Sequence, residues 1–148
     1  MPLICLVTLG MRYTFFTNAC KQAVHAAVHT QSFQQDFPPE LSAQTTANET
    51  AKKCCQAFSG VKLNTVKTSI VVTPITGGAS AEEPGKLASA ADEEKFLYQI
   101  QVRMSGQLYP IVDLPQGVLG ISIPGLTMPY AVDTFAREVS ENTQGLNK

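Results

Sequence analysis

The residues best suited to chemistry are two histidines and four cysteines. His25 and His29 are four positions apart, so on a helix they would share one face and could bind a single metal ion, with Cys20 about one turn earlier. The sequence offers no third strong ligand at a suitable position. The spacing therefore favours two polar side chains on the solvated side of an amphipathic helix, and we predict no metal site and no cofactor.

The adjacent pair Cys54 and Cys55 raises the question of redox chemistry. Neighbours on a helix point about 100° apart, so a direct bond between them would strain the backbone. Cys55 fits an apolar stripe, whereas Cys54 could form a disulfide with Cys20 if the protein matures in an oxidising compartment. The sequence does not settle the connectivity.

Catalytic motifs are missing from the chain. No serine lies in a GxSxG elbow, no glycine-rich loop precedes a lysine and a hydroxyl residue, and no HExxH occurs. The 11 basic and 12 acidic residues give a net charge of −1, which provides no field to hold a polyanion. We therefore predict a protein that is not an enzyme and has no catalytic residues, no nucleic-acid partner and no evident small-molecule substrate.

The first 16 residues are unusually apolar. No charged side chain precedes Arg12, and Tyr13, Phe15 and Phe16 extend the apolar character beyond it. A membrane-spanning helix needs about 20 apolar residues, so the segment resembles the second half of such a helix. A secretory signal peptide would need a basic start and a small-residue cleavage site. A buried core helix of a soluble domain remains the alternative.

The apolar period continues and predicts one helix from about Leu3 to Gln31. Residues 1–32 would form a partial membrane anchor and residues 33–41 a linker, because Pro38 and Pro39 end the helix. The stripe expected to pack runs through Leu6, Leu9, Tyr13, Phe16, Cys20, Ala23, Ala27 and Thr30.

Residues 42–139 predict a head domain. Ser42 is a suitable N-cap for a second helix with a narrow alanine-rich stripe that ends before Gly60. Strands are expected at 61–74, 96–109 and 128–139. The predicted fold is therefore α+β, with a long N-terminal helix and a second helix on one face of a small antiparallel sheet of about three strands.

The connecting segments read as irregular. Residues 76–95 are acid-rich and predict a solvated loop, and residues 140–148 predict a flexible tail. The proline- and glycine-rich segment 109–129 predicts a crossover loop. Its expected apolar anchors are Ile111, Val112, Leu114, Val118, Leu119, Ile121 and Ile123.

Several segments, in order, resemble one protein family. They are Tyr13–Phe16, the run Asn18-Ala19-Cys20-Lys21-Gln22-Ala23, the alanine stripe, Ile70–Pro74, and Ala131-Val132-Asp133-Thr134-Phe135-Ala136-Arg137-Glu138. Together they resemble the TadE-like and TadG-like minor pilins, or pseudopilins, of the bacterial tight-adherence (Flp, type IVc) pilus system. The family's upstream half of the membrane helix has no counterpart here, so either the chain begins downstream of the true start or it is not a working pseudopilin. An in-frame upstream extension of roughly 15 to 25 residues would complete the spanning helix.

The resemblance implies a structural role in pilus assembly and cell adhesion. It implies a single-pass helix in the bacterial inner membrane and a head domain in the periplasm or outside the cell. The partners would be other pilin-like subunits or pilus assembly proteins, in a pilus or a related secretion apparatus. Membrane or helix packing would fall to Leu6, Leu9, Gly10, Tyr13 and Phe16.

Two other classes of function stay open. One is a soluble interaction module whose first helix is part of its core. The other is a small metal or thiol redox domain that would use Cys20, His25, His29, Cys54 and Cys55.

Overall fold

The computed structural model describes residues 2–111 and 123–148. Most of the apolar anchors expected in the crossover loop, from Val112 to Ile121, lie outside the described residues. The elements run in the order α1 (Pro2–Val28), α2 (Ala43–Gln56), β1 (Val61–Pro74), β2 (Ala81–Glu83), β3 (Phe96–Leu108) and β4 (Tyr130–Val139), followed by a 3-10 turn at Thr143–Gly145.

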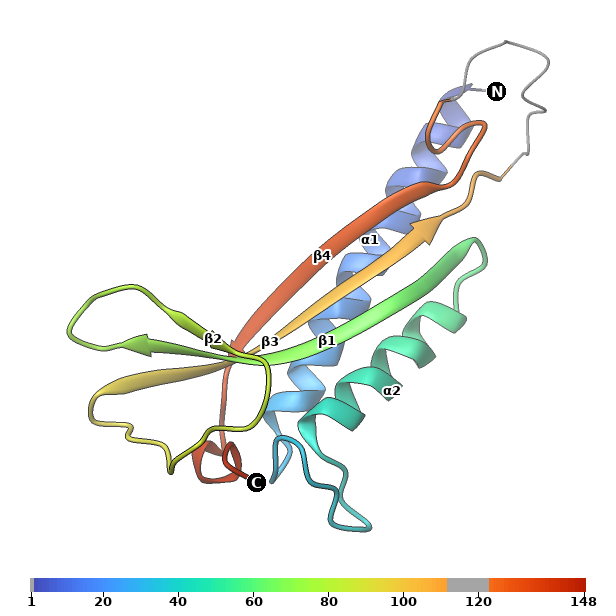
Figure 1. The fold of residues 1–148 in the computed structure, drawn as a ribbon. Coiled ribbons are helices and arrows are strands. Elements are labelled where there is room, and N and C mark those ends of the chain that lie inside the picture. Colours follow the sequence, from blue (N-terminus) through green and yellow to red (C-terminus); the bar gives the residue numbers. More distant parts are fainter. Residues whose placement is uncertain (1, 112–122) are drawn as a thin grey trace.

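The elements form two layers, a helical layer and an antiparallel sheet (Figure 1). The strand order is β2-β1-β3-β4, and α1 covers β3 and β4 whereas α2 covers β1. The α+β prediction is confirmed, but within the described residues the sheet has four strands and not three. The additional strand, β2, lies in the predicted loop and pairs with the end of β1, with Val71 opposite Glu82.

A polar cluster on the sheet face away from the helices explains why β2 forms. Gln101 is fully buried there, and its side-chain amide donates to Glu82 Oε1 at 2.9 Å. Ser69 Oγ donates to the same oxygen at 2.7 Å, and Arg137 Nε donates to Gln101 Oε1. Because buried polar groups must find partners, this network holds Glu82 against side chains of β1 and β3 and so holds β2 at the edge of the sheet.

Helix α2 has the N-cap and the buried face that the sequence predicts. Ser42 caps it by accepting from the Thr45 backbone N–H at 3.4 Å, and its own N–H donates to Asp36 Oδ1 at 2.7 Å, which lowers the pKa of that carboxyl group. The predicted small-residue stripe is the buried face, as Ala43, Ala47, Ala51 and Cys55. Side chains this small let α2 approach both α1 and β1 closely.

The core lies between the helices and the sheet, and it includes the second half of α1. Phe16 is 0% exposed, and the alanines and valines that follow it line the same face. Of the predicted stripe, the part from Phe16 to Ala27 is therefore correct. Residues 16–28 belong to the head domain, so the expected boundary at residue 32 does not separate the helix from the head. The buried residues of this half are Phe16, Ala19, Cys20, Ala23, Val24, Ala27 and Val28.

The C-terminal residues do not form the flexible tail that the sequence suggests. Ser140 donates its backbone N–H to the Tyr98 carbonyl at 3.0 Å, and the Gly145 carbonyl accepts from Phe33 at 3.1 Å. Leu146 is only 2% exposed and joins the core, while its carbonyl accepts from Leu87. The tail is polar in composition, yet one leucine and several backbone hydrogen bonds anchor it beneath the sheet.

Candidate functional site

The N-terminal half of α1 carries a patch of exposed apolar side chains, which we call the α1 apolar surface. In Figure 1 this half extends well past the end of α2, beside the far ends of β3 and β4. Leu6 is 54% exposed and Tyr13 45% exposed. A single exposed side chain of this kind is ordinary, but several on one stretch of helix form a patch. The surface consists of Leu3, Ile4, Leu6, Val7, Met11 and Tyr13.

The threonine hydroxyl groups in this half of the helix are satisfied by the helix itself. Thr8 Oγ1 donates to the Ile4 carbonyl at 2.7 Å, and Thr14 Oγ1 donates to the Gly10 carbonyl at 3.0 Å. Threonines bonded in this way present their methyl groups outward and need no other partner. The surface is therefore effectively apolar between Leu3 and Tyr13.

The opposite side of the same half faces the fold. Cys5 is buried, and Leu9 packs against the core and lies so close to Gly125 that a Cβ on that glycine would come within 2.4 Å of Leu9 Cδ2. Arg12 follows one turn later, and its guanidinium donates to the Tyr109 carbonyl and lies against Gly60. The inward positions are thus 5, 9, 12 and 16.

The five residues predicted for membrane or helix packing therefore separate into two groups. Leu6, Gly10 and Tyr13 are exposed, whereas Leu9 and Phe16 face the chain's own sheet and loops. The sequence pattern missed this division because leucine and phenylalanine suit a bilayer and a protein core equally well.

A stacked aromatic pair marks the point where α1 enters the head. The rings of Phe15 and Phe58 lie 4.0 Å apart between centroids and within 11° of parallel. Phe58 follows the last turn of α2, so the pair ties the two helices together at that level. Beyond it, towards the N-terminus, α1 has no helix beside it among the described residues.

All four cysteines are free thiols in this structure. Cys20 is buried and its thiol donates to the Val102 carbonyl at 3.3 Å, whereas Cys54 lies at the side of the helix pair and donates to Gln22 Oε1 at 3.3 Å. Burial raises the pKa of both Cys20 and Cys55 to about 11. These two thiols are therefore neutral and weakly nucleophilic at neutral pH.

His25 and His29 lie on one exposed face of α1, as their spacing predicts. Cys20 points instead into the core, so the structure does not bring it to the histidines. Across residues 2–111 and 123–148, no group of three or more His, Cys, Asp or Glu side chains is arranged to hold a metal ion.

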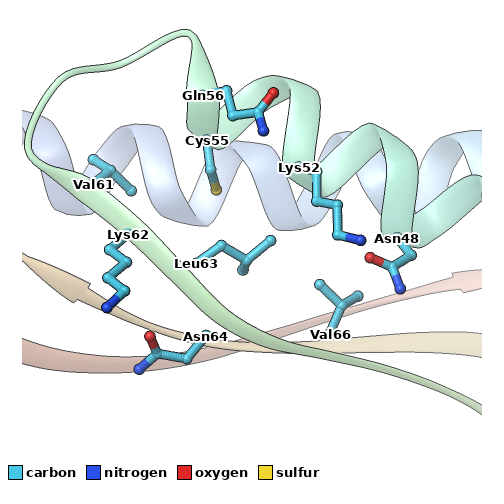
Figure 2. A pocket seen from close by; sticks show the side chains of 9 residues that line it. All are labelled: Asn48, Lys52, Cys55, Gln56, Val61, Lys62, Leu63, Asn64 and Val66. Atoms are coloured by element: carbon cyan, nitrogen blue, oxygen red, sulfur yellow. The ribbon is translucent and has the colours of Figure 1, made fainter.

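A groove with a volume of about 500 Å³ lies between α2 and β1 (Figure 2). Asn48, Lys52 and Cys55 line it from α2, and Leu63 and Val66 line it from β1. The groove holds no carboxylate or histidine that could act as an acid or base. It is an open gap between two packed elements.

By length and composition, the stretch Leu3–Val28 could cross a membrane. The core helix of a soluble protein and a signal sequence would meet the same criterion. In this chain the second half of the helix is part of the core, whereas the first half is largely exposed. Only the second half therefore resembles the core helix of a soluble protein.

Comparison of the chain with protein-family models, curated proteins and solved structures gives no match.

Proposed function

We propose that this chain is a non-enzymatic, membrane-anchored subunit of a pilus or related secretion apparatus, similar to the TadE-like pseudopilins. The observation that carries the proposal is the α1 apolar surface, which lies on a helix whose other half is the core of a folded head. Contiguous apolar patches of this kind usually mark contact with a membrane or another protein.

The dimensions of the surface fit one leaflet of a bilayer. Eleven residues from Leu3 to Tyr13 extend about 16 Å along a helix, roughly half of the 30 Å hydrocarbon core. Arg12 limits insertion, because its guanidinium is held at the Tyr109 carbonyl and a charge inside hydrocarbon is costly. The head would then sit in water at the membrane surface, in the periplasm or outside the cell.

The same surface suits contact with other helices. Gly10 is exposed and has nothing within 4 Å of the position that a Cβ would occupy, so a neighbouring helix could approach closely there. Small residues drive helix association in membranes because they permit such approach. The partners we propose are the corresponding helices of other pilin-like subunits.

Membrane attachment can be tested with charges placed only on the exposed side. We expect the double variant Leu6→Asp/Val7→Asp to move from the membrane fraction to the soluble fraction of expressing bacteria, because two carboxylates would have to enter hydrocarbon. The wild-type chain should remain with membranes after a high-salt wash. Circular dichroism of the variant should be unchanged, since neither side chain contributes to the core.

The matched control is Leu97→Asp/Phe135→Asp, which places two carboxylates at exposed apolar positions on the sheet. This variant should stay with the membrane. A wild-type chain that is soluble without detergent would refute the proposal and support the soluble interaction module, for which the buried second half of α1 is the supporting observation.

A further inference from the structure

The two histidines of α1 direct one ring nitrogen of each towards the other. His25 Nε2 and His29 Nε2 are 3.5 Å apart, the ring centroids are 4.7 Å apart and the rings are nearly perpendicular. Both side chains are solvent-exposed, so core packing does not impose this arrangement.

Two carboxylates far along the chain fix the tautomer of the neutral rings. His25 Nδ1 lies 3.0 Å from Glu138 Oε1, at the end of β4, and His29 Nδ1 lies 2.7 Å from Glu141 Oε2, just beyond it. An ionised carboxylate can only accept a hydrogen bond, so each Nδ1 must carry the proton. In a neutral imidazole of this tautomer Nε2 carries no proton and can bind a metal ion, and the two Nε2 atoms are 3.5 Å apart.

We propose that His25 and His29 form a binding site for a divalent transition-metal ion such as Zn²⁺, with Nε2 of each ring as ligand. Two nitrogens that each lie about 2.05 Å from a tetrahedral ion are about 3.3 to 3.4 Å apart, close to the separation seen here. This inference does not depend on the proposed membrane role.

The two glutamates complete the expected architecture. Histidines that bind metals usually donate their second ring N–H to a carboxylate, which fixes the tautomer and increases the basicity of the ligand. Glu138 and Glu141 do this for both rings. They come from residues more than 100 positions along the chain, so the pair is assembled only when β4 packs against α1.

The donor set selects the type of ion. Imidazole nitrogens suit Zn²⁺, Cu²⁺ and Ni²⁺ and do not suit Ca²⁺ or Mg²⁺, which prefer oxygen. With two protein ligands on an exposed face, water would complete the coordination and exchange would be easy. The site would therefore be an open one, distinct from a closed structural zinc centre.

Calorimetric titration with zinc chloride tests the site, in a Cys54→Ser background that removes the partly exposed thiol. We expect one Zn²⁺ to bind per chain and His25→Ala to weaken binding at least about tenfold. The double variant Glu138→Gln/Glu141→Gln should weaken it by about 10- to 100-fold, as is typical when the partners of metal-bound histidines are lost. In ¹⁵N NMR spectra, Zn²⁺ should shift the Nε2 resonances of both rings.

The matched control keeps two histidines on the same helix but separates them. In the variant Lys21→His/His25→Ala, the histidines at positions 21 and 29 are about 12 Å apart along the axis, too far to share an ion. Because this control also loses the positive charge of Lys21, it should bind cations non-specifically at least as well as the parent protein does. Equal Zn²⁺ affinity of this control and the parent protein, or no binding by the parent, would overturn the proposal.

Discussion

At the scale of single residues, Gly106 determines how α1 meets the sheet. A Cβ at this position would lie 2.5 Å from the Lys62 carbonyl oxygen and 2.7 Å from the ring of Phe16. Both distances are shorter than real contacts allow. The glycine near the end of β3 therefore leaves the space that the Phe16 ring occupies.

We expect Gly106→Ala to lower the free energy of unfolding by about 1 to 3 kcal/mol, because the methyl group must displace either the Phe16 ring or a β1 carbonyl. Gly10→Ala is the matched control. That glycine is exposed within a helix and nothing lies near its missing Cβ, so alanine should be neutral or stabilising by up to about 1 kcal/mol.

Urea denaturation followed by circular dichroism measures both variants. A Gly106→Ala protein as stable as the parent would show that Phe16 is not held against β3 in the way described. The same measurement on the control separates a packing effect from the general effect of replacing glycine.

At the scale of elements, the C-terminal residues behave as part of the core. We expect Leu146→Ala to lower the free energy of unfolding by about 2 to 5 kcal/mol, because a fully buried leucine loses its contacts and leaves a cavity. Leu41→Ala, at a partly exposed position in the loop before α2, should change it by less than about 0.5 kcal/mol. Equal midpoints in urea for the two variants would mean that the tail is not docked in solution.

The long elements could be predicted from the sequence because each has a local signal. The period of small residues predicts α2, and Ser42 predicts where it begins. Alternating apolar residues predict β3, whose buried residues include Tyr98, Ile100 and Val102. These signals depend only on neighbours in the chain.

The remaining features depend on partners that are distant in sequence. The three residues of β2 have no apolar period, and they become a strand only because Glu82 reaches Gln101 and Ser69. The tail is ordered by backbone bonds to Phe33 and Leu87. Likewise, the histidine pair was recognised from its spacing, but the carboxylates that orient it are separated from it by most of the chain.

At the scale of the whole molecule, the two halves of α1 differ in their surroundings. Its second half packs against both the sheet and α2, so opening it requires the head to unfold. Its first half contacts the fold through side chains such as Leu9 and Arg12 and leaves its other side in solvent. Local opening should therefore cost less in the first half than in the second.

Hydrogen exchange with mass spectrometry can locate the boundary between the two halves and test the membrane role together with it. Without lipid, amides in residues 3–14 should exchange faster than those in residues 16–28, because a half-exposed helix opens locally. Vesicles of phosphatidylethanolamine and phosphatidylglycerol should slow exchange in residues 3–14 at least about tenfold, since an unpaired backbone group in hydrocarbon costs several kcal/mol. Residues 16–28 and β3 serve as the internal control and should not change. Uniform protection of α1 without lipid, with no effect of vesicles, would instead assign the whole helix to the core of a soluble domain.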